Sequence, residues 1–416
     1  MADPDHFGTP RRLLRRYWGT LLFTILLVGA ASATMAVADE HNFFGDEASE
    51  ELTVPGAGRL PAADSVPAGH TLVAQAPGLP PSGGLNVYAY TGAGMLAGPA
   101  RRARYLVYVP DSQGNGVYVI NPRTYKVAGF YPTGDQVQHV VPAWDLRTLY
   151  ATNDQGNSLT PFNPYTGRPA GSNIPVDDPY NMYFTPDGRH AIVVEEARSI
   201  LAFRDPHTFA VQKPVPVSCS GIDHMDFSAD GRYALASCEY SGQMAWIDVQ
   251  AERVVRYLSV GGSPQDVKLS PDGRVFYVAN RYLPAQHGSG VQLVDANRLR
   301  TVGFLRTRLD AHGLYISRNT RDLYVTSRAG GAVSVVDLAQ RKIVAVWPVP
   351  GTPDMGGVSP DGKTLWLAGR YSGAVYAIST RDGRLLATIR AGISPHGLCV
   401  WPQPGRYSTG HTGVMR

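Results

Sequence analysis

The chain is poor in charge and in the short motifs that name a reaction. Charged residues make up 17% of its 416 positions and the formal net charge is +4, which gives no argument for binding nucleic acid or a membrane surface. No continuous stripe of basic and aromatic side chains is visible. The sequence also lacks a nucleophile elbow, a CxxC pair and a His-Glu-x-x-His zinc motif. Function must therefore be sought in how residues gather in space.

Cysteine is also scarce, with three residues in the chain: Cys219, Cys238 and Cys399. Cys219 precedes one predicted strand and Cys238 ends the next, so antiparallel pairing brings them close together. In an oxidising compartment this predicts a disulfide, and the alternative is two separate buried thiols. Cys399 alternates into a strand and is predicted to be a packed thiol rather than a reactive one.

What the chain does have is a repeat. A turn residue follows an apolar strand at intervals of 42, 42, 43, 47, 42 and 42 residues, at Asn121, Asn163, Asp205, Asp248, Asp295, Asp337 and Ser379. A period near 42, filled with short alternating apolar runs, is typical of a β-propeller with one four-stranded antiparallel blade per repeat. We therefore predict an all-β, seven-bladed β-propeller over residues 85–401.

Each repeat has the same internal order. A tight turn such as Pro271–Gly273 precedes a strand such as Tyr324–Ser327, and a further strand such as Val333–Asp337 comes next. A last element has the form of Pro395–Trp401. This order resembles the YVTN-repeat β-propeller family, whose YncE-like members are extracytoplasmic seven-bladed propellers. The resemblance covers residues 103–401 and is loosest in repeats two and three, and it implies no single function.

Ring closure follows from the same alignment. Each repeat ends with the inner strand of the next blade, so Pro395–Trp401 is expected to complete the first blade, which begins near Tyr105. The Gly/Pro-rich tail, residues 402–416, is predicted to form neither strand nor helix and to lie over one face of the ring. Leu85–Tyr90 alternates in hydrophobicity, which predicts an extra strand at the rim.

The N-terminal segments predict export. Arginines at positions 11, 12, 15 and 16 precede an apolar run from Tyr17 to Ala38. Residues 1–38 are therefore either a cleaved signal peptide or a retained membrane anchor, and in both cases the propeller lies outside the cytoplasm. Residues 39–84 are first acidic and then rich in Pro, Gly and Ala, which predicts a flexible linker.

Aligning the repeats places two columns of polar residues at the mouth of the central channel. They include four histidines and three aspartates: His139, His224, His312, His396, Asp223, Asp266 and Asp354. Imidazole and carboxylate groups bind zinc, copper and iron, so one interpretation is a transition-metal site formed by the four histidines. The other is a wet, polar channel mouth without metal, because the family's own repeat often has Pro-His-Gly here.

A second ring of loops on the same face carries charge of both signs. Blades three and four offer acidic side chains such as Glu239, whereas later blades offer Arg281, Tyr282, Arg328, Arg370 and Tyr371. Guanidinium groups pair with carboxylates and phosphates, so these loops suit an anionic ligand. The alternative is a set of solvated loops with ion pairs between blades. An insertion at Tyr282–Gly290 is either a lid or a neutral loop.

We therefore expect an exported, monomeric propeller that binds an anionic small molecule, a glycan or an envelope protein through its channel-mouth face. The rival hypothesis is a metal- or cofactor-dependent lyase, hydrolase or redox enzyme that uses the histidine-rich funnel, and a purely structural envelope protein is a third. The predicted ligand-binding set is His139, Asp223, His224, Glu239, Arg281, Tyr282, His312, Arg328, Asp354, Arg370, Tyr371 and His396.

Overall fold

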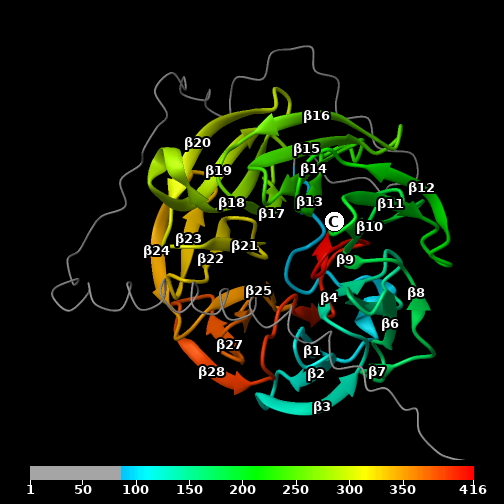
Figure 1. The fold of residues 1–416 in the computed structure, drawn as a ribbon. Coiled ribbons are helices and arrows are strands. Elements are labelled where there is room, and N and C mark those ends of the chain that lie inside the picture. Colours follow the sequence, from blue (N-terminus) through cyan, green and yellow to red (C-terminus); the bar gives the residue numbers. More distant parts are fainter. Residues whose placement is uncertain (1–85) are drawn as a thin grey trace, which may run out of the picture. The chain divides into compact units, whose positions relative to one another are not determined.

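The computed structural model describes residues 86–416, which form a ring of seven β-sheets around a central axis (Figure 1). Each sheet is one blade, and its antiparallel strands lie side by side in order from the axis to the rim. The predicted all-β, seven-bladed propeller is confirmed. The predicted leader, residues 1–38, and linker, residues 39–84, lie outside the described residues. Within residues 86–416, no helix is long and apolar enough to cross a membrane.

The blades share one plan of inner, second, third and outer strand. The inner strands are β29 (Cys399–Trp401), β4 (Val137–Pro142), β9 (Pro179–Phe184), β13 (Ile222–Phe227), β17 (Pro264–Leu269), β21 (Ala311–Ile316) and β25 (Pro353–Val358). The second strands are β1 (Leu106–Asp111), β5 (Leu149–Asn153), β10 (Ala191–Glu195), β14 (Tyr233–Cys238), β18 (Val275–Leu283), β22 (Asp322–Ser327) and β26 (Thr364–Gly369).

The third strands are β2 (Gly116–Asn121), β6 (Ser158–Asn163), β11 (Ile200–Arg204), β15 (Gln243–Asp248), β19 (Gly288–Asp295), β23 (Ala332–Asp337) and β27 (Ala374–Ser379). The outer strands are β3 (Lys126–Pro132), β7 (Arg168–Pro169), β8 (Ile174–Pro175), β12 (Val211–Pro216), β16 (Arg253–Ser259), β20 (Arg300–Arg306), β24 (Lys342–Pro348) and β28 (Leu385–Arg390). Two short helical turns complete the described elements, α2 (Gly98–Arg101) and η1 (Pro284–Gln286).

The hydrophobic pattern of each strand follows its place in the blade. Every residue of the inner strand β17 is buried, whereas the outer strand β24 alternates between exposed and half-buried positions. Apolar side chains fill the space between neighbouring blades in seven separate clusters, one per interface. The cluster between blades seven and one, which includes Val107, Val109 and Trp366, has the same character as the others. Packing is therefore continuous around the ring.

The repeated turn residues are hydrogen-bonded caps. In the Pro-Asp-Gly turn, Asp272 Oδ1 accepts the Arg274 N–H at 3.1 Å and the Ser270 hydroxyl at 2.5 Å. Asp230 and Asp361 make the same two contacts in their own blades. These side chains satisfy backbone donors that the tight turn leaves unpaired, which explains why the column repeats.

The strands β1 and β29, which lie far apart in the sequence, meet in the first blade. β29 pairs antiparallel with β1, with Leu106 opposite Trp401 and Tyr108 opposite Cys399. The chain then continues into a hairpin of β30 (Ser408–Gly410) and β31 (Val414–Met415) that adds to the inner strand β9. The prediction that residues 402–416 form no strand is therefore wrong. These residues have a low intrinsic propensity for strands, and pairing with the open edge of β9 stabilises the hairpin.

This C-terminal hairpin lies inside the channel rather than over a face (Figure 1, red). His411 N–H donates to Met182 O in blade three at 2.9 Å, and the Thr412 hydroxyl donates to Gly356 O in blade seven at 3.1 Å. The last residue, Arg416, is buried and pairs with Asp226 of blade four at 2.7 Å. The hairpin thus connects three blades across the axis.

The predicted rim strand at Leu85–Tyr90 is also absent from the described part of that segment, residues 86–90, which forms turns. Asn86 Oδ1 accepts the Tyr88 N–H at 2.9 Å, and the Tyr88 hydroxyl donates to Leu269 O at 2.8 Å. Local capping by Asn86 therefore replaces strand pairing, and the segment anchors on blade five.

We predict that the first blade is a weak point for mutation. Trp401 is fully buried where β29 meets β1, so Trp401→Ala should lower the free energy of unfolding by about 3–5 kcal/mol. The measurement is urea unfolding followed by far-UV circular dichroism. Trp347→Ala, on the outer strand β24, is the matched control and should cost clearly less because its side chain is only half-buried. Equal losses for both variants would contradict a special role for the β29–β1 contact.

Candidate functional site

Five histidines gather on the ring axis, from separate blades and from the tail. Ring centroids of His139 lie 5.6 Å from His224, 4.9 Å from His396 and 5.5 Å from His411. The His312 ring lies 6.1 Å from that of His224 and 6.2 Å from that of His396. All five side chains are buried. The structure thus brings together the four predicted histidines and adds His411, which the repeat alignment did not reach.

A repeated irregularity of the inner strands turns these side chains toward the axis. In β4, β13, β17, β21 and β25 the register with the second strand shifts at the two predicted polar columns. A Ser or Thr hydroxyl of the second strand takes the backbone N–H freed there: Thr152 accepts from His139 at 3.1 Å and Ser237 from His224 at 3.1 Å. β-Bulges of this kind redirect side chains, often at functional sites.

The imidazoles are neutral at neutral pH. Burial lowers the pKa of all five well below the usual 6.5, because the charged form loses its hydration. Nearby positive charge lowers the pKa further. For His396, the charge of Arg370 is the largest cause of the lowered pKa after burial. A neutral imidazole keeps one lone pair, so each ring can accept a proton or bind a metal ion.

Asp354 connects two of the histidines to an arginine. Its Oδ2 lies 2.6 Å from His396 Nδ1, and its Oδ1 lies 3.2 Å from His312 Nδ1 and 3.4 Å from Arg328. The carboxylate is buried and joins the channel to the charged loops above it. The hydrogen bond to Asp354 fixes the orientation of the His396 ring, whereas His312 Nδ1 lies near the carboxylate without a hydrogen bond to it.

A polar cavity of about 280 Å³ opens above this cluster at the channel mouth. It is lined by Gln136, Gln138, Asp154, Tyr180, Glu196, Glu239, Tyr240, Gln265, Arg281, His312, Arg328, Arg370, Tyr371 and His396. The lining contains no aliphatic side chain, so a matching ligand is itself polar. The opposite end of the channel holds the C-terminal hairpin.

One wall of the cavity is basic. Arg281 pairs with Glu239 at 2.6 Å and Asp310 at 2.8 Å, and Arg328 pairs with Asp310 at 3.0 Å. The two contacts of Arg281 are ion pairs between blades, as one of the two interpretations of the loops predicted, whereas Arg328 and Asp310 pair within blade six. Arg370 differs, since it makes no hydrogen bond or ion pair within residues 86–416.

The facing wall is acidic but partly uncharged. Burial raises the pKa of Glu196 to about 7. A hydrogen bond with Tyr240 lowers this pKa, and the nearby charge of Glu239 raises it. Burial and the neighbouring Asp178 raise the pKa of Asp154 to about 7. Both groups therefore carry less than a full negative charge near neutral pH, and the positive charge of the basic wall is only partly offset.

The predicted ligand-binding residues fall into three places. Seven of them line the cavity: Glu239, Arg281, His312, Arg328, Arg370, Tyr371 and His396. Four are buried beside or below it: His139, Asp223, His224 and Asp354. Tyr282 is 51% exposed and is not among the lining residues. The insertion at Tyr282–Gly290 lengthens the hairpin of β18 and β19 and includes η1.

Sequence reasoning missed several residues of the site. Asp154 lines the cavity but belongs to no repeated pattern that marked it as a ligand, whereas Glu196 and Tyr240 lie in the second ring of loops that the sequence singled out. His411 lies in Gly410–Gly413, whose glycines predict a turn but not its burial in the channel. Only the folded tail brings this histidine to the axis.

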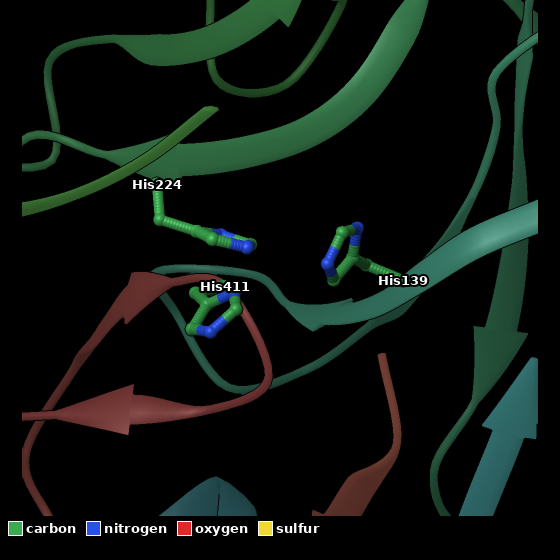
Figure 2. A group of neighbouring side chains, drawn as sticks. All are labelled: His139, His224 and His411. Atoms are coloured by element: carbon green, nitrogen blue, oxygen red, sulfur yellow. The ribbon is translucent and has the colours of Figure 1, made fainter. Parts of the chain in front are cut away.

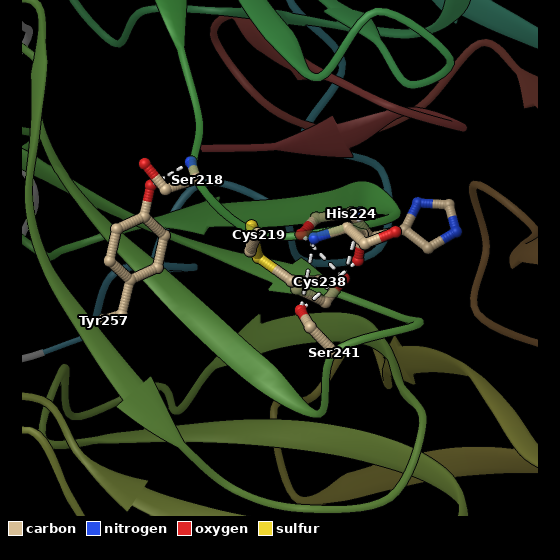
Figure 3. Close-up of a disulfide and its surroundings, with 8 residues drawn as sticks. Ser218, Cys219, His224, Cys238, Ser241 and Tyr257 are labelled. Atoms are coloured by element: carbon tan, nitrogen blue, oxygen red, sulfur yellow. Dashed lines mark hydrogen bonds between the residues drawn. A yellow bond between two sulfur atoms is a disulfide. The ribbon is translucent and has the colours of Figure 1, made fainter.

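Cys219 and Cys238 form a disulfide in the structure, with Cα atoms 5.9 Å apart (Figure 3). The bond joins the segment before β13 to the end of β14. Directly after Cys238, Glu239 N–H donates to Gly221 O at 2.7 Å. The crosslink therefore holds the loop that presents Glu239 and Tyr240 to the cavity. Cys399 is a buried free thiol, and burial raises its pKa.

The fold and the site define a class, a seven-bladed β-propeller with a polar cavity at one end of its channel. Within this class, the sequence model of the YNCE-like beta-propeller family matches residues 288–404, which confirms the resemblance predicted from the repeats.

Two curated proteins match part of the chain. Antigen Lp49 of Leptospira interrogans is 28% identical over 182 residues, 39% of this chain and 39% of that protein. The seven-bladed beta-propeller protein Rv1057 of Mycobacterium tuberculosis is 26% identical over 164 residues, 36% of this chain and 38% of that protein. The matches therefore span less than two thirds of either relative.

Among solved structures, a chain of Kuenenia stuttgartiensis hydrazine synthase superposes with a TM-score of 0.59 at 20% identity. The superposition covers 68% of this chain and 94% of that chain. At this identity the likeness shows the fold alone.

We predict that the disulfide stabilises the domain. Cys219→Ser with Cys238→Ser should lower the free energy of unfolding by about 3 kcal/mol, because the bond closes a loop with a sequence separation of 19. The measurement is urea unfolding of both proteins. As a check, thiol titration of the unfolded wild-type chain should find one thiol before reduction and three after it. Three thiols without reduction would contradict the pairing.

Proposed function

We propose that this chain is an extracytoplasmic binding propeller that holds a small, hydroxylated organic anion, such as a sugar acid, in the cavity at the channel mouth. The observation that carries the proposal is Arg370, which lines the cavity without a hydrogen bond or ion pair to any carboxylate among the described residues, although the charge of Arg370 acts on Asp354 nearby. A guanidinium group in this setting is matched by a carboxylate or phosphate of a ligand, which it binds with two parallel hydrogen bonds.

Arg281 and Arg328 support the same ligand class in a different way. Their ion pairs with Asp310 hold both guanidinium groups in place before a ligand arrives. Preorganised groups lose little conformational entropy on binding, and their remaining donors and field act on an anion in the cavity. Gln138, Gln265 and Tyr180 add amide and hydroxyl groups that suit the hydroxyls of a sugar-like molecule.

The aromatic residues at the rim favour a small ring over an extended chain. Tyr240 is 68% exposed and Tyr371 is 66% exposed, and both line the cavity. Tyrosine combines a flat apolar face with a polar end, so two of them can hold a sugar ring from opposite sides. An exported location is supported by the disulfide between Cys219 and Cys238 and by the basic, then apolar, N-terminal sequence.

A metal-dependent enzyme is the second candidate. The observation that favours it is that His312 and His396 line the cavity, while Asp354 is hydrogen-bonded to His396 and lies beside His312. Neutral histidines beside a ligand site have the geometry of general bases. Turnover of a sugar acid or its lactone by the purified chain, lost in His396→Gln, would favour this candidate over binding alone.

We predict that Arg370→Ala weakens the binding of D-glucuronate by about 1.5–3 kcal/mol, or about 10- to 150-fold, through loss of a charge-assisted contact. The measurement is isothermal titration calorimetry with hexuronates, aldonates and sugar phosphates. D-Glucose is the matched neutral ligand, and Arg381→Ala, with a side chain 87% exposed on an outer turn, is the matched control variant. Absence of heat from every anion, or equal binding of glucose, would refute the proposed ligand class.

We also predict that anion binding tightens as the pH falls from about 8 to about 6. Glu196 and Asp154, each with a pKa of about 7, lose negative charge over this range, so their repulsion of the ligand falls. The charged and titratable groups facing Glu196 are Tyr240, Glu239, Asp154 and Asp178. Glu196→Gln should flatten the pH dependence of the dissociation constant. A binding constant that is independent of pH in the wild-type chain would disprove this part.

A further inference from the structure

We propose that His139, His224 and His411 form a binding site for one first-row transition-metal ion, such as Zn²⁺ or Cu²⁺, on the propeller axis. This site differs from the four-histidine set that the sequence suggested, because the tail supplies its third ligand. It also stands apart from the anion cavity, since none of the three histidines lines that cavity.

The geometry is that of a converging triad. Each histidine offers one ring nitrogen, and these three atoms all lie within 4.8 Å of one another. Figure 2 shows the rings approaching a common space from three different segments of the chain. Ligands at 2.0–2.1 Å from a tetrahedral ion lie about 3.4 Å apart, so movements of the order of 1 Å would complete the site.

The buried nitrogens lack other partners. Nε2 of His139, of His224 and of His411 has no hydrogen-bond partner within residues 86–416, and all three side chains have zero exposure. An unpaired polar atom in the interior is destabilising, and here the three rings that carry such atoms lie together. A metal ion bound by three imidazoles would satisfy this set in one step.

One strand orients all three rings from behind. The carbonyl of Tyr180 on β9 lies 2.9 Å from His139 Nδ1. The amide nitrogen of the next residue, Asn181, lies 3.2 Å from His224 Nδ1 and 2.9 Å from His411 Nδ1. The His139 contact has the form typical of metal-ligating histidines, whose second ring nitrogen donates to a carbonyl. The Asn181 amide instead donates to His224 and His411, so these two rings give up that contact when they bind a metal through Nε2.

Two carboxyl groups lie beside the triad, and burial raises the pKa of both, so they supply oxygen atoms rather than a full negative charge. An Asp223 oxygen lies 3.2 Å from His224 Nε2, and an Asp266 oxygen lies 3.7 Å from His411 Nε2. Neither oxygen of Asp223 has a hydrogen-bond partner of good geometry among the described residues. Lys268 neutralises Asp266 in part, at 3.3 Å. Zn²⁺, Cu²⁺ and Ni²⁺ bind readily to imidazole nitrogens, whereas Mg²⁺ and Ca²⁺ prefer a site made of oxygen ligands alone.

The test begins with the full chain purified without an affinity metal and without a chelator. We expect about one equivalent of metal by elemental analysis after dialysis against Zn²⁺ or Cu²⁺, and tetrahedral d–d absorption after loading with Co²⁺. Metal should also raise the melting temperature, because it ties the C-terminal hairpin to blades two and four. His411→Gln should weaken binding by about 100-fold or more and remove this thermal shift.

His312→Gln is the matched control, since His312 is buried in the same channel but lies outside the triad. Its metal affinity should stay close to wild type. His224→Gln, on β13, provides a second loss-of-ligand variant in case His411→Gln displaces the tail, and circular dichroism checks the fold of each. No metal uptake by the wild-type chain, or loss of uptake in His312→Gln but not in the two triad variants, would overturn the proposal. Glucuronate binding by the metal-free chain separates this outcome from that of the anion cavity.

Discussion

The polar backbone groups that face the ring axis need hydrogen-bond partners, and the groups that supply these partners determine the rest of the structure. Seven inner strands turn one edge toward the axis, and each edge carries backbone groups that need partners. The C-terminal hairpin meets this need at β9 and reaches across to blade seven through Thr412. Hydrogen bonds between inner strands do the same elsewhere: the Tyr315 hydroxyl lies 2.6 Å from Gly356 N, and Asp266 accepts from Leu314 N at 2.8 Å. Because polar groups fill the axis, the interior of this ring is suited to chemistry.

The filling is unequal along the axis, and this decides where a ligand can bind. The hairpin and the turns of residues 86–90 occupy one end of the channel, while the cavity of about 280 Å³ stays open at the other. Charged loops then surround the open end, with Arg281 and Arg328 held by acidic partners and Arg370 left without one. Between the two ends lie the five buried histidines, kept neutral by their lack of solvent. The proposed binding face and the proposed metal site therefore share one axis but use different residues.

Much of the fold was predictable because the repeat is local. Turn residues such as Asp272 cap their own hairpins, and the alternation of each strand reflects burial within a blade, so both signals lie within about 42 residues. The polar columns were predictable for the same reason, since the bulges that present His139 and His224 recur at one position in each repeat. The tail was mispredicted because Gly- and Pro-rich residues have low strand propensity by themselves. Their hairpin exists through pairing with β9, a contact far away in the sequence.

The amino-acid sequence by itself determined the number of blades, the order of strands within each blade and four of the five axial histidines. These features arise from short-range pattern: strand alternation, turn chemistry and a constant period. Only the tertiary structure decided that His411 joins His139 and His224, that Tyr282 lies outside the cavity and that Arg370 makes no ion pair with the described residues there. Each of these depends on how segments from different blades meet in space. The repeat in the sequence does not predict which distant segments come into contact, and the pattern itself ends at Trp401, before the tail that carries His411.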